Sequence, residues 1–583
     1  MSNILKVILS GACSALAAAS LSACAAPQAS SAPPAQLAGA AQSAAAPSPG
    51  SAAQSAAPLE TAAEFAPLAA AASAAGAAAS PAGSAGTSSP AAARADAKPY
   101  YYVAPGGSDK TGTGAKDRPW QTLQRAANEA AKTGGTVYAR KGVYRQQLKL
   151  ADLKPAGSAP RLTVASYPSE TAVLDGTGLP VDGSEGLIEL DNVSRVTIRG
   201  FELRGYKTAA RDAVPIGIYV RGAGDDIRLL DNKVHAVANT AAPAGQGLTG
   251  RDAHGIAVYG TEAQASIRNL TIAGNEVYNL TLGTSEAVVL NGNVEKFTVE
   301  NNYVHDNDNI GIDAIGFEGT SPNPQTDQAR GGIIRGNLVT GSTSDRNPSY
   351  GRRIPNGSHS AGGIYIDGGR DIVVERNRSL RNDIGVEIAS EHAGRSTSNI
   401  TVRSNLLARN ALTGLAMGGY DEERGSTTNS VVTGNTIAYN DTLEWGTGQL
   451  YIQFDTRGNE IRNNIFAASG TNELIVNEYA QNTNNRVDYN LYFTRDAAEA
   501  VWMWKNKTYT GFADYRKGTG SDAHSVFAAP MFQNAAKDDY RLKADSPAQG
   551  KGIADAVLSA SPDLAGNKRG ASHAGRPSLG AYE

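Results

Sequence analysis

The stretch Thr298-Val-Glu-Asn-Asn302-Tyr-Val304 decides the fold, because variants of it recur along the chain. Each copy has a short β-branched run, then Asn, then an apolar pair, as in Thr271-Ile-Ala-Gly-Asn275-Glu-Val277. The Asn recurs from Asn232 to Asn490 at spacings of 43, 27, 35, 40, 28, 30, 29 and 26 residues. A shortest spacing of 26 with variable excess indicates one structural rung per repeat, with insertions confined to loops.

Each rung contains two or three short strands separated by Gly, Asn and Asp turns, and helical periodicity is absent from this region. Short strands joined by tight turns at a constant period, without hairpin alternation, predict an all-β parallel β-solenoid. Successive coils would then lie about 4.8 Å apart. The repeated Asn is expected at the same bend of each coil, where it hydrogen-bonds its neighbours above and below as a ladder.

Both ends of the globular region resemble the pectin-lyase-like right-handed parallel β-helix superfamily. The start has Tyr101-Tyr-Val-Ala-Pro-Gly-Gly-Ser-Asp109, an amphipathic segment at 117–131 and Gly135-Thr-Val-Tyr-Ala-Arg-Lys-Gly-Val-Tyr144. The terminal Leu579-Gly-Ala-Tyr-Glu583 is similar to the closing coil of secreted members. The resemblance implies a single-stranded right-handed parallel β-helix with an N-terminal capping helix, a C-terminal appendage and a bias towards carbohydrate chemistry.

The first 97 residues precede the globular region. Residues 1–23 are predicted to be a lipoprotein signal peptide, since an apolar stretch too short to span a membrane leads into Leu21-Ser-Ala-Cys24, which resembles a bacterial lipobox. Lipid on Cys24 would anchor the chain to the bacterial outer membrane, on its periplasmic or outer surface. Of the 73 residues that follow Cys24 up to residue 97, 34 are Ala. Because alanine side chains bury too little apolar surface to form a core, residues 24–97 are predicted to form a disordered tether.

The rest of the chain is predicted to hold an N-terminal cap and first coil at 98–150, the parallel β-helix at 151–495, and C-terminal coils with an aromatic-rich lobe at 496–583.

The net charge of −3 provides no basic face, which argues against nucleic acid as a partner. The two cysteines, Cys13 and Cys24, both precede the globular region and leave it no disulfide. We expect a monomer.

Three carboxylates are predicted on the outer face of adjacent strands. The aligned strands are Gly311-Ile-Asp313, Gly363-Ile-Tyr365-Ile-Asp367 and Gly385-Val-Glu387. Because strand side chains alternate between faces, Ile312, Ile364 and Val386 should point inward, and the carboxylates with Tyr365 outward. Asp367 and Glu387 would lie about 8 Å apart along the backbone, which suits a glycosidase pair. Repulsion between them would raise one pKa, as a general acid requires.

Two long insertions, at 317–330 and 342–360, flank these coils and are expected to wall a cleft. Candidate substrate-binding residues lie in the second insertion, on the strands and just beyond them: Tyr365, Glu391, His392, Arg352, Arg353, His359 and His254. A purely solubilising role for the outward charges is one alternative. A Ca²⁺ site is another, since clustered carboxylate oxygens bind that ion.

The carboxylate cluster favours a surface-anchored glycoside hydrolase that acts on an oligo- or polysaccharide, with Asp367, Glu387 and Asp313 as catalytic residues and no required cofactor. A non-catalytic, glycan-binding or adhesive β-helix is an alternative. The hydrolase and the non-catalytic protein would both bind a polysaccharide.

A polysaccharide lyase or C5-epimerase acting on a uronate polymer is a further alternative. No Lys occurs between Lys296 and Lys505, so a lysine base is excluded from the central coils. Four arginines could still act as the base: Arg330, Arg335, Arg352 and Arg353. The stretch Gly311-Ile-Asp313 faintly resembles uronate epimerases, but the Pro-His-Asp that follows in those enzymes is replaced by Ala314-Ile-Gly316.

Overall fold

The computed structural model describes residues 100–153, 161–242, 248–571 and 573–583. The predicted signal peptide, the lipid site at Cys24 and the predicted tether lie outside the described residues. Among the described residues, no helix is long and apolar enough to cross a membrane.

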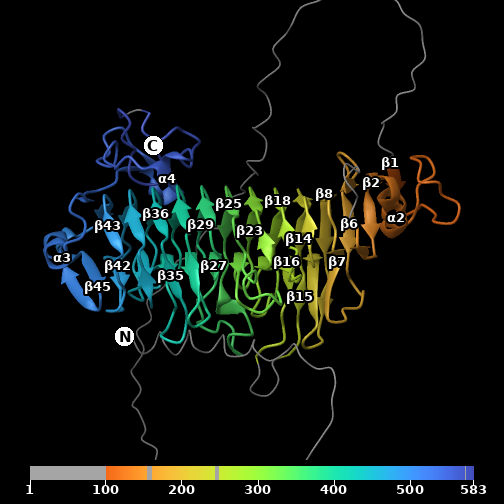
Figure 1. Ribbon diagram of the computed structural model, residues 1–583, viewed down its shortest axis with the longest axis horizontal. Helices are drawn as coiled ribbons and strands as arrows, with labels where there is room; N and C mark the ends of the chain where they lie inside the picture. The colour runs from red at the N-terminus through yellow and green to blue at the C-terminus, as the bar shows by residue number, and fades with distance from the viewer. Residues whose placement is uncertain (1–99, 154–160, 243–247, 572) are drawn as a thin grey trace, which may run out of the picture. The chain divides into compact units, whose positions relative to one another are not determined.

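Three 13-stranded sheets run through the described chain, and each coil contributes one strand to each sheet (Figure 1). Sheet 1 runs from β1 (Tyr100–Val103) to β43 (Arg486–Asp488), and sheet 3 from β3 (Gly142–Tyr144) to β47 (Val526–Phe527). Neighbouring strands in these two sheets pair in parallel, as in β22 (Thr298–Glu300) with β25 (Ile333–Arg335). The predicted all-β parallel β-helix is therefore confirmed, and its strands extend on both sides of residues 151–495.

Sheet 2 carries the candidate site. Ile312 pairs with Ile364 and Ile364 with Val386, and all three side chains are fully buried. The predicted register and the inward direction of these residues are therefore confirmed. The strands of sheet 2 are β4 (Leu148–Ala151), β7 (Ser184–Asp191), β11 (Val214–Arg221), β16 (His254–Gly260), β20 (Val288–Gly292), β24 (Ile312–Ile315), β27 (Gly362–Asp367), β30 (Ile384–Ala389), β34 (Thr413–Met417), β38 (Leu450–Ile452), β42 (Glu473–Asn477), β45 (Val501–Trp504) and β46 (Lys507–Thr510).

The repeated Asn forms the predicted ladder. Asn302 donates its backbone N–H and its Nδ2 to Asn337 Oδ1, both at 3.0 Å, and Asn337 donates to Asn377 in the same way. The ladder runs from Asn232 to Asn490 without a gap. A second ladder, which the sequence did not predict, joins Asn382, Asn410 and Asn440 and ends on Gln449.

The N-terminal end of the coils is covered by helix α2 (Leu123–Thr133), which buries Leu123 and three alanines against the first strands. The helix was expected at 117–131 but begins later. Asp109 accepts hydrogen bonds from the backbone N–H groups of Gln121 and Thr122, which holds the preceding residues in a turn. The Thr122 hydroxyl then caps the helix.

The C-terminal end is covered by aromatic side chains. Helix α3 (Phe512–Thr519) places Tyr515 on Trp502, with ring centroids 5.0 Å apart, and both side chains are fully buried. The last segment folds back onto sheet 3 as β48 (Phe532–Asn534) and β49 (Asp539–Leu542). In α4 (Ala556–Ser559), the Val557 carbonyl oxygen accepts a hydrogen bond from Arg403 on sheet 1. These aromatic residues therefore pack the end of the fold.

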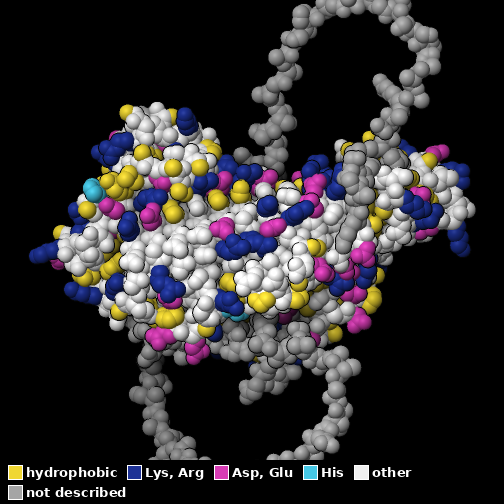
Figure 2. Space-filling model, viewed as in Figure 1, with side chains coloured by type: hydrophobic (Ala, Val, Ile, Leu, Met, Phe, Trp, Pro, Cys, Tyr) yellow, Lys and Arg dark blue, Asp and Glu magenta, His cyan; other side chains and the backbone are white. Residues whose placement is uncertain are grey.

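Surface charges of both signs are interspersed on the face shown in Figure 2. Charged side chains elsewhere on the coils pair with those of the adjacent coil, as Arg221 does with Asp191 at 2.8 Å and Arg403 with Glu375 at 2.6 Å. Such pairs add coil-to-coil contacts outside the backbone ladder, although exposed ion pairs contribute little individually.

Substituting Asn337→Ala should lower the free energy of unfolding by about 2–4 kcal/mol, because the buried backbone N–H of Asn302 loses its acceptor. Asn128→Ala, on the exposed face of α2, is the matched control and should change it by less than about 0.5 kcal/mol. Urea unfolding followed by circular dichroism measures both. Equal stability of the two variants would contradict a structural role for the ladder.

Candidate functional site

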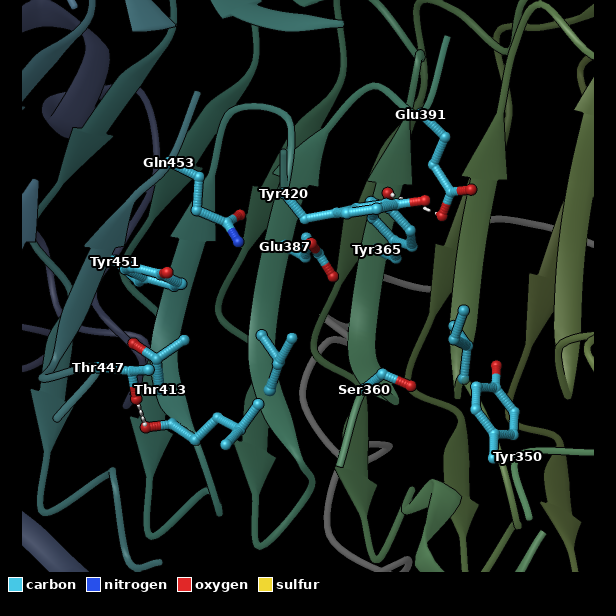
Figure 3. A pocket seen from close by; sticks show the side chains of 13 residues that line it. Tyr350, Ser360, Tyr365, Glu387, Glu391, Thr413, Tyr420, Thr447, Tyr451 and Gln453 are labelled. Atoms are coloured by element: carbon cyan, nitrogen blue, oxygen red, sulfur yellow. Dashed lines mark hydrogen bonds between the residues drawn. The ribbon is translucent and has the colours of Figure 1, made fainter. Parts of the chain in front are cut away.

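A pocket of about 650 Å³, including its open mouth, lies on the outer face of sheet 2 over β27, β30, β34 and β38 (Figure 3). Tyrosines, hydroxyl groups and two carboxylates dominate its walls. Among the described residues, no Lys or Arg lines it. The lining residues are Ile310, Tyr350, Ser360, Tyr365, Ile384, Glu387, Glu391, Leu412, Thr413, Tyr420, Thr447, Tyr451 and Gln453.

Glu387 stands on β30 at the floor of this pocket and is 6% exposed. In register it lies between Tyr365 on β27 and Ala416 on β34, and the small Ala416 leaves room on one side. Burial, followed by the charge of Glu391, raises the pKa of Glu387 to about 8. The Glu387 carboxyl is therefore mostly protonated at neutral pH.

Glu391 lines the same pocket from the turn after β30. Its Oε1 accepts a hydrogen bond from the Tyr365 hydroxyl at 3.4 Å (Figure 3). Its backbone N–H donates to Asp367 Oδ1 at 2.9 Å. Burial raises the pKa of Tyr365 far above its ordinary value, so the hydroxyl remains a donor. Tyr365 and Asp367 together hold Glu391 in the pocket that Glu387 also lines.

Asp313 and Asp367 lie on the outer face as predicted but do not line the pocket. They are 2% and 4% exposed. The pKa of each is raised well above its ordinary value, first by burial and then by neighbouring carboxylates, Glu286 for Asp313 and Glu391 for Asp367. The three predicted catalytic carboxylates thus belong to one acidic cluster, of which only Glu387 faces the pocket.

Two further carboxylates, which the sequence did not suggest, belong to the acidic cluster. Glu286 lies two residues before β20, and after burial its charge is the largest cause of the raised pKa of Asp313. Glu318 follows β24 and accepts a hydrogen bond from Asn291 Nδ2 at 2.6 Å. Glu318 lies in the insertion at 317–330, where no strand register could place it.

His392 and His254 border the acidic cluster rather than the pocket. His392 lies in the turn after β30, with a ring nitrogen near Glu318 and Asp367. His254 is 3% exposed and its Nδ1 lies 3.0 Å from the Glu286 carbonyl oxygen, so Nδ1 donates. Its Nε2 then accepts from the Tyr259 hydroxyl at 3.1 Å.

The remaining candidate substrate-binding residues do not reach the pocket. Arg352 and Arg353 are exposed on the insertion at 342–360, and His359 lies 3.0 Å from Asp383. That insertion does wall the pocket, but through Tyr350 and Ser360. The loop turns these side chains inward because its own hydrogen bonds, such as Ser360 N–H to Ser344 Oγ, fix its path.

The arginines considered as lyase bases also lie elsewhere. Arg330 pairs with Glu295 at 3.0 Å and Arg335 with Glu300 at 2.7 Å. The residues that the sequence missed in the pocket include Tyr451 and Gln453, on or next to β38. Extending the strand alignment by two coils would have found Tyr451, since Glu387 pairs with Ala416 and Ala416 with Tyr451.

A family model for a right-handed β-helix region matches residues 182–423. The uncharacterized protein YwoF of Bacillus subtilis is 40% identical over 452 residues, which cover 77% of this chain and 92% of YwoF. Pectate lyase PEL9 of Emericella nidulans is 28% identical over 127 residues, 21% of this chain and 30% of that enzyme. The solved structure of pectate lyase Pel9A matches with a TM-score of 0.44 and 15% identity, over 83% of this chain and 96% of that one. By the extent of the match with YwoF, the chain belongs to the family of right-handed β-helix proteins that includes YwoF.

Proposed function

We propose that the protein is a glycoside hydrolase whose paired carboxylates are Glu387 and Glu391. The observation that carries the proposal is that both side chains line one pocket, in which Glu387 is buried enough to keep its proton. The tyrosine rings and the hydroxyl and amide groups around them suit the apolar faces and hydroxyls of a sugar. The substrate is therefore an oligo- or polysaccharide.

Glu387 acts as the general acid and protonates the glycosidic oxygen as the bond to the anomeric carbon breaks. Glu391 supplies the second carboxylate, which either attacks the anomeric carbon or takes the proton of the water that attacks it, and Tyr365 and Asp367 position it. This pairing replaces the sequence-based pair of Asp367 with Glu387, because Asp367 lies outside the pocket lining. Asp367 is then a positioning residue.

The resemblance of 127 residues to pectate lyase PEL9 favours β-elimination on a uronate polymer as a second candidate function. A lyase must abstract a proton beside a carboxylate whose charge is neutralised. The pocket offers two carboxylates and, among the described residues, no Lys or Arg lining. Because Glu387 keeps its proton, repulsion between the Glu391 carboxylate and a uronate is what disfavours that substrate, and a neutral sugar meets no such penalty.

Substituting Glu387→Gln or Glu391→Gln should reduce kcat on the substrate by about 10²–10⁴, since each removes an acid–base or nucleophilic group. Bacterial exopolysaccharides and neutral or uronate-containing plant polysaccharides are screened for released reducing ends. Glu423→Gln, in an exposed glutamate outside the pocket lining, is the matched control and should retain activity. Products with an ultraviolet-absorbing double bond would instead identify a lyase.

The pH dependence of stability tests the state of Glu387 separately. Because the pKa of Glu387 rises from 4.5 to about 8 on folding, its stabilising contribution is complete below about pH 4.5 and is lost as the pH rises towards 8. Glu387→Gln should therefore gain stability relative to the wild type by up to about 1.4 kcal/mol per pH unit in this window. Thermal unfolding from pH 5 to 8 measures it, and a constant difference between the two proteins would contradict the raised pKa.

A further inference from the structure

Three side chains beside the pocket present possible metal-ligand atoms to one point. Glu318, Asp367 and His392 each offer one such atom, and these atoms lie within 4.8 Å of one another. Ligand atoms about 2.1 Å from one ion lie about 3.4 Å apart at tetrahedral angles. Small side-chain rotations would therefore bring the three atoms close enough to bind one ion. The three residues come from successive coils, on the turn after β24, the end of β27 and the turn after β30.

Unpaired buried oxygens at the same place provide an independent indication of a ligand. Asn291 is 3% exposed and donates its Nδ2 to Glu318 Oε2 at 2.6 Å, while its Oδ1 has no hydrogen-bond partner in the protein. Asp313 Oδ1 is likewise buried without a partner. A buried acceptor without a donor costs about 1–3 kcal/mol, so unpaired oxygens in native proteins call for an explanation.

The charge of the cluster points to a cation. In the described part of the chain, none of Glu318, Asp367 and Asp313 forms an ion pair with Lys, Arg or His. Asp367 and Asp313 are buried, and buried carboxylates are normally paired or bound to a metal. Glu318 is exposed, which leaves a path from solvent to this point.

We propose that Glu318, Asp367 and His392, with Asn291 Oδ1 as a fourth ligand, bind one divalent transition-metal ion. The imidazole of His392 indicates a transition-metal ion, because imidazole nitrogen suits ions such as Zn²⁺, whereas Ca²⁺ takes oxygen ligands. The ion lies outside the pocket lining and joins three coils. It also fixes the turn after β30, which carries Glu391 into the pocket.

Calorimetric titration of the full chain, purified without a histidine tag and stripped with EDTA, tests the proposal. Zn²⁺ is the probe because such sites bind it more tightly than Mn²⁺ or Fe²⁺. One Zn²⁺ should bind per chain, and Ca²⁺ should bind at least about tenfold more weakly. His392→Ala and Glu318→Gln should each weaken Zn²⁺ binding by about 100-fold or more, and Asn291→Ala by about tenfold.

His524→Ala is the matched control, since His524 also contacts a carboxylate, Asp488 at 2.7 Å, but on a distant and exposed surface. It should leave Zn²⁺ binding unchanged, and circular dichroism confirms that each variant is folded. Unchanged Zn²⁺ binding in His392→Ala, equal loss in His524→Ala, or Ca²⁺ binding as tight as Zn²⁺ would each overturn the proposal. Because the measurement needs no turnover, its failure leaves the hydrolase proposal standing, and the reverse also holds.

Discussion

The hydrogen bonds that lock each coil onto the next are the constraint on which the rest of the structure depends. Parallel strand pairing sets the spacing, and the Asn ladder repeats one buried bend from Asn232 to Asn490. Together they fix the register to the residue. A slip of one residue would turn Asp313, Tyr365 and Glu387 into the core and Ile312, Ile364 and Val386 out of it. The site exists only because that slip is prevented.

The same rigidity lets the fold hold carboxylates where they oppose folding. Asp313, Asp367 and Glu387 are buried in one acidic cluster, and burial, followed by neighbouring carboxylates, raises the pKa of each. Such a cluster is unstable unless protons or a cation compensate for its charge. The two proposals supply this compensation at different residues: a proton on Glu387, and a metal ion bound by Glu318, Asp367 and His392. Binding sites are where a protein is expected to sacrifice stability in this way.

Features with a short repeat were predictable from the sequence. The coil period and the alternation of strand side chains are local properties, so they predicted the ladder, the register and the outward row of Asp313, Tyr365 and Glu387. The same rules place Tyr451 in that row once the alignment is extended by two coils. The capping helix was predicted too, but it begins at Leu123 because Asp109 accepts hydrogen bonds from the backbone of Gln121 and Thr122 and holds them in a turn.

The sequence by itself determined the fold, the coil register and the face on which the carboxylates stand. Only the tertiary structure decided which of them share the pocket. It placed Glu391 there in place of Asp367, brought Glu318 to His392, and left Arg352, Arg353 and His359 outside. The physical reason is that the repeat fixes the position of a strand residue, whereas hydrogen bonds to coils far away in sequence fix the position of a loop residue.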